Sequence, residues 1–127
     1  MKLTALVIDD SKIMRMIIMK LLNESGLAKF KFIEARNGLE ALHLFNPEKI
    51  DICFVDWNMP KMDGLEFVIK ARQMAPMKKI PMIFITSEKC IGKMDCAGEQ
   101  GADSYITKPF NVDILKFKLQ PIIERLT

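Results

Sequence analysis

Short, predominantly apolar runs alternate along this chain with segments in which apolar residues recur at helical spacing. Such runs are typical of strands that are buried on both faces of a sheet. They cover residues 3–8, 30–33, 50–55, 81–85 and 105–106. Strands that alternate with helices favour a parallel sheet with helices on both faces. We therefore expect an α/β fold of five strands and five helices.

The helical segments carry their own boundary signals. The first helix is expected to begin after Ser11, a good capping residue, and to end at Gly26. Later helices are expected at residues 38–45, 65–72 and 114–119. Pro121 should end or kink the last of these, because proline lacks the N–H that continues a helix.

The composition excludes several classes of protein. With 127 residues, 50% hydrophobic and 28% charged, the chain fits one domain over residues 1–127 that buries roughly two thirds of its unfolded surface. No apolar stretch approaches the ~20 residues that span a bilayer, and no signal-peptide pattern precedes the first strand, so a cytoplasmic protein is expected. A net charge of +3 without a basic block argues against direct nucleic-acid binding. Three cysteines and one histidine provide neither a disulfide framework nor a zinc-ligand pattern.

Reactive side chains follow four of the predicted strands. Asp9 and Asp10 follow the first strand, Asp56 the third, Thr86 the fourth and Lys108 the fifth. In an open parallel sheet, ligands bind beyond the carboxyl ends of the strands, at the point where strand order reverses. These five side chains are therefore expected to form one site.

Three carboxylates close together require a cation. Two unit charges about 4 Å apart repel by roughly 4 kcal/mol at an effective dielectric constant near 20, so the pKa values would otherwise be raised. Oxygen ligands select a hard ion, and Mg²⁺ suits few carboxylates, retained waters and a phosphoryl oxygen. An aspartate can attack phosphorus while Mg²⁺ and Lys108 balance the charge and Thr86 donates a hydrogen bond. The residues indicate phosphoryl chemistry coupled to a movement of the Thr86 loop.

These five residues, with Met59-Pro60, Asp63-Gly64 and Lys108-Pro109-Phe110, resemble the CheY-like receiver domains of response regulators over the whole chain. The segment from Asp56 to Pro60 is especially similar to single-domain chemotaxis regulators. The resemblance implies a doubly wound, flavodoxin-like sheet of order 2-1-3-4-5. It also implies a two-component switch that is not an enzyme beyond its own phosphorylation from small donors and its own dephosphorylation.

The same resemblance assigns roles at the acidic site. Asp56 would be the phosphoacceptor, and its phosphoryl group would come from a histidine kinase or a phosphotransfer protein. Mg²⁺, for which Mn²⁺ could substitute, would be bound by Asp9, Asp10, Asp56 and the backbone carbonyl of Asn58. Lys108 would bind the phosphoryl group.

Further roles concern switching and phosphoryl lifetime. Thr86 would bind the phosphoryl group and form a switch pair with Tyr105, and the peptide bond before Pro109 would be cis. Asn58 and Glu88 would tune dephosphorylation, and this chemotaxis-like pair leads us to expect fairly rapid self-dephosphorylation.

The resemblance places partner docking on the fourth helix, the fifth strand and the fifth helix. The fourth helix must fit between Thr86 and Gly101, where Gly92 and Gly98 each cost about 1 kcal/mol relative to alanine. This helix is predicted to be weak, which would make the docking surface depend on phosphorylation. A flagellar motor switch protein or another output protein could receive the signal from a mostly monomeric chain.

Three alternatives remain open. A haloacid-dehalogenase-type phosphatase uses a similar set of groups, but its motif has a second aspartate where Asn58 stands. A degenerate receiver would act as a constitutive binding module, although the intact acidic pair argues against it. The chain could also be a receiver domain cut from a longer regulator, for example a DNA-binding one.

Overall fold

The computed structural model describes residues 2–75, 79–87 and 101–126. Its five strands are β1 (Lys2–Ile8), β2 (Lys29–Ala35), β3 (Ile52–Val55), β4 (Met82–Ser87) and β5 (Ser104–Lys108). All pair in parallel, in the order β2-β1-β3-β4-β5, which confirms the predicted sheet. Since β1 lies between β2 and β3, the direction of winding reverses there.

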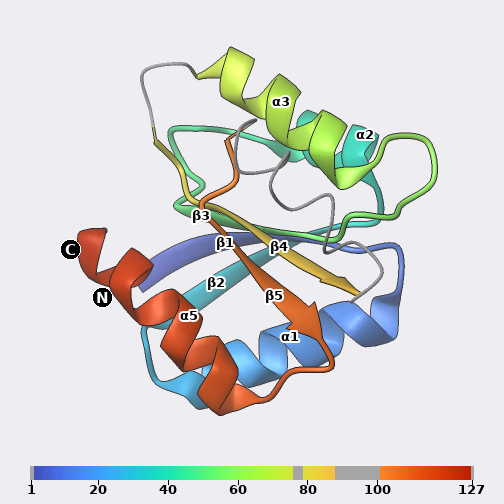
Figure 1. Ribbon diagram of the computed structural model, residues 1–127. Coiled ribbons are helices and arrows are strands. Elements are labelled where there is room, and N and C mark those ends of the chain that lie inside the picture. Colours follow the sequence, from blue (N-terminus) through green and yellow to red (C-terminus); the bar gives the residue numbers. More distant parts are fainter. Residues whose placement is uncertain (1, 76–78, 88–100, 127) are drawn as a thin grey trace.

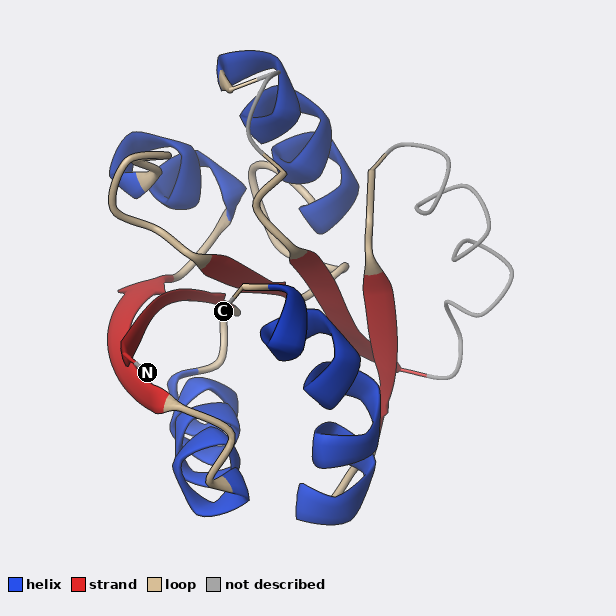
Figure 2. Ribbon diagram, turned by 90° about the vertical axis from the view of Figure 1, so that its left-hand side faces the viewer, coloured by secondary structure: helices blue, strands red, loops and turns tan. Residues whose placement is uncertain are grey.

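Four helices lie within the described residues: α1 (Lys12–Ser25), α2 (Gly38–Leu44), α3 (Gly64–Met74) and α5 (Val112–Arg125). Figures 1 and 2 show α1 and α5 on one face of the sheet and α2 and α3 on the other. The fifth helix expected between Thr86 and Gly101, and its predicted weakness, lie outside the described residues. Of the helices described, none has the length and apolar character needed to cross a bilayer.

Alternate residues of the central strands pack into two apolar cores. On β1, Leu6 and Ile8 belong to the core under α2 and α3, whereas Ala5 and Val7 belong to the core under α1 and α5. All four side chains are completely buried. Because both faces of the sheet are covered, neither face of a central strand needs polar residues, which explains the continuous apolar runs.

The boundaries of α1 agree with the capping signals. The Ser11 hydroxyl accepts a hydrogen bond of 3.2 Å from the Met14 N–H, and Gly26 closes the helix with a left-handed φ of 69°. Side-chain caps also begin the other three helices, at Asn37, Asp63 and Asn111.

Of the two outcomes expected at Pro121, an end or a kink of the last helix, the structure excludes the end. Helix α5 continues through Pro121 and ends at Arg125. Ile122 and Ile123, immediately beyond the proline, are buried in the core under α1 and α5. Their burial stabilises the final turn enough to offset the backbone hydrogen bond that proline removes.

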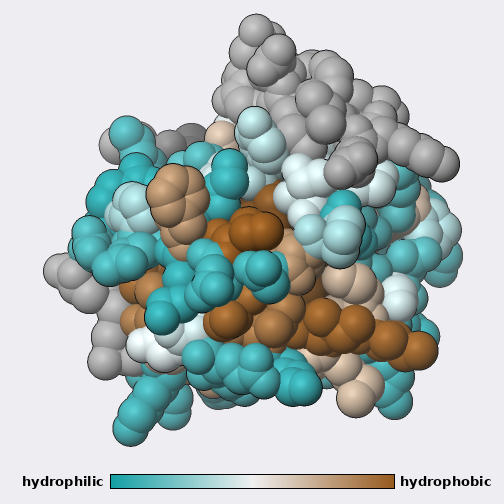
Figure 3. Space-filling model, turned by 60° about the horizontal axis from the view of Figure 1, so that its bottom comes forward, coloured by the Kyte–Doolittle hydropathy of each residue, from teal (hydrophilic) through white to brown (hydrophobic). Residues whose placement is uncertain are grey.

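Large apolar side chains remain exposed on the side formed by α1 and α5. Figure 3 shows this side, where apolar surface lies among hydrophilic side chains. The exposed apolar residues on these helices are Ile13, Met16 and Ile17 of α1 and Ile114 and Phe117 of α5. Phe117 is 80% exposed, so it contributes little to the core and is accessible to other molecules.

Candidate phosphoryl-transfer and metal site

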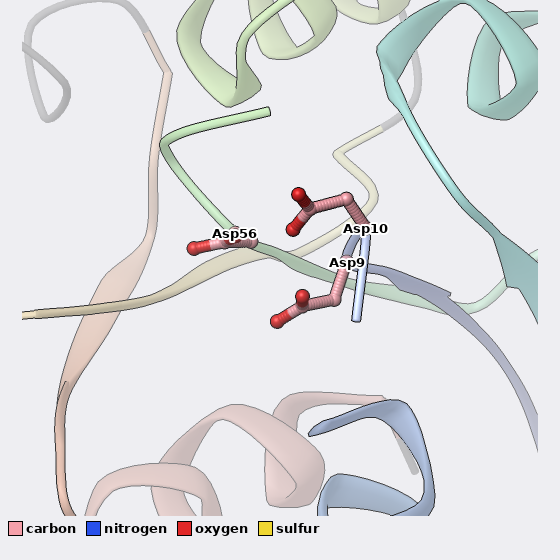
Figure 4. Close-up of side chains that lie close together, drawn as sticks. All are labelled: Asp9, Asp10 and Asp56. Atoms are coloured by element: carbon pink, nitrogen blue, oxygen red, sulfur yellow. The ribbon is translucent and has the colours of Figure 1, made fainter. Parts of the chain in front are cut away.

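Three aspartates meet where β1 and β3 end. Asp9 and Asp10 follow β1, Asp56 follows β3, and one carboxylate oxygen from each lies within 4.8 Å of the other two. Figure 4 shows the three side chains at these neighbouring strand ends. The Asp56 N–H donates to the Ile8 carbonyl at 2.9 Å, which extends the pairing of the strands up to the site. The predicted convergence of the three carboxylates is confirmed.

Asp9 is the most constrained of the three. Its side chain is buried, and its backbone N–H donates to the Ala35 carbonyl at 3.1 Å. Its Oδ1 accepts a hydrogen bond of 2.9 Å from the Ser11 N–H, and its Oδ2 accepts one of 3.3 Å from Lys108 Nζ. Both carboxylate oxygens are therefore oriented by neighbours.

Lys108 brings a positive charge to the cluster from β5, the edge strand of the sheet. It is the last residue of β5, and its Nζ lies 3.3 Å from Asp9 Oδ2 and 3.4 Å from Asp56 Oδ1. The peptide bond between Lys108 and Pro109 is cis, in agreement with the prediction. A single ammonium group opposite three ionised carboxylates leaves an excess of negative charge, which suits a divalent cation.

The pKa of Asp56 is raised to about 6, chiefly by burial and then by the negative charge of Asp9, although Lys108 opposes this rise. At neutral pH most of the carboxylate is still ionised, as a nucleophile requires. A bound cation would lower this pKa, because it favours the charged form.

The turn after β3 fixes the backbone position of Asp56. The Gly64 N–H donates to the Trp57 carbonyl at 2.9 Å, and a Cβ at Gly64 would collide with the Asp56 carbonyl oxygen and the Phe84 ring. Glycine is therefore required at this close approach of two backbone segments. Lys61, within the turn, adopts a positive φ of 70°.

Thr86 lies near the end of β4, at the same edge of the sheet. Val55, the residue before Asp56, pairs with Phe84 of β4. Thr86 lies two residues beyond Phe84 in the same strand. Among the described residues, its Oγ1 is the buried side-chain oxygen that has no hydrogen-bond partner. An unpaired buried hydroxyl costs about 1–3 kcal/mol, so an oxygen acceptor near Thr86 would be stabilised.

Tyr105 points outward in this structure. Its side chain is 42% exposed, and Lys118 Nζ lies 4.7 Å from the ring centroid. On β5 it pairs with Phe84, while Thr86 pairs with Thr107. Asn58 is exposed in the turn after Asp56, and Glu88 lies outside the described residues.

One buried residue next to the site was not predicted from the sequence. Arg15 is only 7% exposed and donates to the Asp9 backbone carbonyl. It lies three and seven residues before the buried Ile18 and Leu22, in the apolar row of α1. A charged residue in such a row indicates that it has a buried polar partner. This pattern is the sequence signal that could have identified Arg15.

Comparisons with known proteins agree with this geometry. Residues 5–120 match the family model described as "Response regulator receiver domain". The chain is 40% identical over 124 residues to the chemotaxis protein CheY1 of Helicobacter pylori, a match that covers 93% of this chain and 94% of that protein. It is 39% identical over 119 residues to a chemotaxis protein CheY homolog of Campylobacter jejuni, covering 93% and 90% of the two chains.

Solved structures show the same arrangement of the chain. A response regulator receiver domain protein from Clostridium thermocellum superposes with a TM-score of 0.85 at 26% identity, covering 98% of this chain and 96% of that one. The chemotaxis protein CheY4 of Vibrio cholerae superposes with a TM-score of 0.82 at 30% identity, covering 96% and 99%. The matched residues 5–120 include the acidic cluster, Thr86 and Lys108.

Proposed function

Because this chain belongs to the response regulator receiver domain family and is a two-component response regulator, we propose that Asp56 is its phosphoacceptor. The observation that carries this proposal is the convergence of Asp9, Asp10 and Asp56 within 4.8 Å. Receiver domains are phosphoacceptor switches rather than typical enzymes, so we expect one phosphoryl group per chain. We take the domain to extend over residues 1–127.

Mg²⁺ is the proposed cofactor, with Mn²⁺ as a substitute. The donor set supports this choice, because the cluster offers carboxylate oxygens and an excess of negative charge. Asp9, Asp10 and Asp56 would hold the ion together with the backbone carbonyl of Asn58. When bound, Mg²⁺ would neutralise charge that develops on the transferred phosphoryl group.

The residues of the chain would carry out the transfer in the following way. An Asp56 carboxylate oxygen forms a bond to phosphorus while the P–N bond of a phosphohistidine donor breaks and its electron pair returns to the imidazole nitrogen. Lys108, whose Nζ lies 3.4 Å from Asp56 Oδ1, would bind a phosphoryl oxygen. The hydroxyl of Thr86, which is unpaired among the described residues, would donate to another.

Phosphorylation would then act as a switch through Thr86 and Tyr105. The new group adds about −1.5 to −2 charge, and its contacts would draw Thr86 toward Asp56. Movement of Thr86 would favour burial of Tyr105, which is now 42% exposed. A complete reversal of two populations from 1:99 needs about 5.5 kcal/mol, so we propose a partial shift.

The proposed partners follow from the chemotaxis relatives. A histidine kinase or a phosphotransfer protein would donate the phosphoryl group, and a flagellar motor switch protein or another output protein would bind the fourth helix, β5 and α5. The exposed Tyr105, Ile114 and Phe117 support a protein-binding role for the described part of this surface. We also propose a mostly monomeric, cytoplasmic protein with fairly rapid self-dephosphorylation tuned by Asn58 and Glu88.

The test is intact mass spectrometry of the chain during incubation with excess acetyl phosphate and Mg²⁺. We expect one phosphoryl increment, which is lost when the metal is chelated. The Asp56→Asn variant should show none, whereas Asp51→Asn, which alters a carboxylate before β3, should behave like the unmodified chain. The proposal fails if the unmodified chain takes up no phosphoryl group or if Asp56→Asn takes it up equally well.

A further inference from the structure

Arg15 makes two contacts directly beside the acidic cluster. Its Nη1 donates to the Asp9 backbone carbonyl at 2.7 Å, and its Nε donates to Glu34 Oε1 at 2.9 Å. The arginine is 7% exposed, and the carbonyl contact is buried. Burial of a guanidinium group is costly unless partners satisfy it, so this arrangement is a specific feature of the fold.

The carbonyl that Arg15 contacts belongs to the peptide group that joins Asp9 to Asp10. The orientation of that peptide sets the direction in which the Asp10 side chain leaves the backbone. Asp10 is exposed, and within the described part of the chain no hydrogen bond holds its carboxylate. Its position therefore depends on the backbone that Arg15 holds.

Like charges in the cluster act against this arrangement. Without a cation, repulsion between the carboxylates favours backbone conformations that move Asp10 away from Asp9 and Asp56. A buried hydrogen bond to a charged donor is among the stronger hydrogen bonds in proteins, so it can resist this movement. Glu34, which lies in β2, holds the guanidinium group in turn.

We propose that Arg15 is a positioning residue for the metal site. By holding the Asp9–Asp10 peptide, it keeps the two carboxylates at the spacing that a divalent cation needs. This inference rests on the proposed function, since it concerns the same site. It adds that the affinity for Mg²⁺ depends on a residue that contacts neither the ion nor the phosphoryl group.

A positioning role and a purely electrostatic role of Arg15 predict opposite changes in Mg²⁺ affinity when the residue is replaced. A positive charge near an acidic cluster repels a cation, so its loss should tighten Mg²⁺ binding. Loss of positioning should weaken binding instead, because partners that orient metal ligands typically contribute about 10–100-fold in metal affinity. The sign of the change therefore distinguishes the two roles.

The experiment is a titration of the full chain with Mg²⁺ alone, followed by calorimetry and by fluorescence of Trp57. We expect Arg15→Met, which retains most of the buried stem, to bind Mg²⁺ about 10-fold more weakly or worse. Arg15→Lys retains the charge but loses the planar fork that reaches two partners at once, so we expect Mg²⁺ binding to weaken several-fold. Glu34→Gln should show a smaller loss in the same direction.

Arg72→Met is the matched control. Arg72 also donates to backbone carbonyls, of Ile80 and Gly101 at 2.6 Å each, and to Asp103 Oδ2 at 2.9 Å. These contacts lie before β4 and β5, at the opposite edge of the sheet. We expect this variant to lower the unfolding temperature and leave the Mg²⁺ affinity unchanged.

Each outcome separates the inference from the proposed function. If folded Arg15→Met binds Mg²⁺ as tightly as the unmodified chain or more tightly, the positioning role is overturned. Equal weakening in Arg72→Met would also overturn it, because general loss of stability would then explain the effect. If Arg15→Met does not fold, an unchanged affinity in Glu34→Gln overturns it. Failure of the unmodified chain to bind Mg²⁺ would instead overturn the proposed metal site itself.

Discussion

Aspartates at the two edges of the sheet have opposite consequences for the folded protein. At the amino edge, Asp51 Oδ2 accepts from the Thr4 N–H at 2.7 Å, and Asp103 Oδ2 accepts from the Met82 N–H at 2.8 Å and from Arg72. Each of these carboxylates satisfies a backbone donor at the start of a strand. Asp51 precedes β3 and Asp103 precedes β5, and β4 lies between these two strands, so the fold gains hydrogen bonds with little repulsion.

At the carboxyl edge, three aspartates crowd together around one lysine. Burial and the charge of Asp9 raise the pKa of Asp56, which means that ionised Asp56 destabilises the metal-free fold. A nearby hydroxyl, that of Thr86, also has no partner among the described residues. The comparison indicates that the carboxyl edge is less stable in the metal-free protein than the amino edge. A cation and a phosphoryl group can supply the interactions that are missing there.

The largest expected effect is on phosphorylation. Asp56→Asn removes the nucleophile and should abolish phosphoryl uptake from acetyl phosphate, because an amide oxygen is a poor nucleophile toward phosphorus. Asp103→Asn, at the amino edge, should retain uptake. Intact mass spectrometry measures both. Equal uptake by the two variants would remove the functional difference between the edges.

The next largest effect concerns the metal. Asp10→Asn removes a proposed ligand and should weaken Mg²⁺ binding by roughly 10-fold or more, because a neutral amide oxygen attracts the ion less than a carboxylate does. Asp51→Asn should leave the affinity unchanged. Calorimetric titration with Mg²⁺ checks this prediction, and unaltered binding in Asp10→Asn would exclude the residue as a ligand.

Stability should respond most strongly at the amino edge. Asp103→Ala leaves the Met82 N–H and the Arg72 guanidinium without this acceptor and should lower the free energy of unfolding by about 2 kcal/mol. Chemical denaturation of the metal-free chain gives the value. Asp10→Ala is the matched variant and should cause little loss or a gain, because it relieves repulsion. The reverse order would contradict the comparison.

The pH dependence of the free energy of unfolding should reveal how much the ionisation of Asp56 destabilises the folded protein. Its folded-state pKa of about 6 lies above the ordinary value of 3.8, so the unfolded chain loses its proton first as pH rises. The resulting destabilisation is absent below about pH 4, grows up to about pH 6 and then stays constant.

Asp56→Asn should therefore stabilise the metal-free protein at pH 7, on the order of 1 kcal/mol after allowance for solvent screening. The difference from the unmodified chain should disappear near pH 4. Thermal unfolding in a chelator at several pH values measures it. A stabilisation that does not change with pH would show that Asp56 ionisation is not its source.

The smallest expected effect is at Thr86. Thr86→Val replaces the unpaired buried hydroxyl with a methyl group of similar shape, so the metal-free chain should change by less than about 1 kcal/mol or gain stability. Thr86→Ala is the control for volume and should be less stable than Thr86→Val, because it leaves a small cavity. Denaturant midpoints of both variants compare the effect of losing the hydroxyl with the effect of the cavity. A large loss in Thr86→Val would indicate that the hydroxyl has a partner in solution.

Much of this organisation was predictable from local patterns in the sequence. Predominantly apolar runs identified the five strands, and Ser11 and Gly26 marked the ends of α1. The acidic cluster followed from the positions of aspartates after those runs, because parallel strands end at the same edge of a sheet. Burial on both faces leaves a strong signal in the order of residues, since it removes polar alternation.

Other features depended on contacts between residues that are distant in sequence. The Arg15 bond to the Asp9 carbonyl and the outward position of Tyr105 were not predicted. Local patterns also left open whether the last helix ends at Pro121 or continues through it. Lys108 was expected near the site, but its equal approach to Asp9 and Asp56 required the packing of five strands. Periodicity and capping reveal which segments form and where reactive groups emerge, because they act between near neighbours. The partner that each buried charge finds, and the cost of leaving one unpaired, depend on how those segments pack.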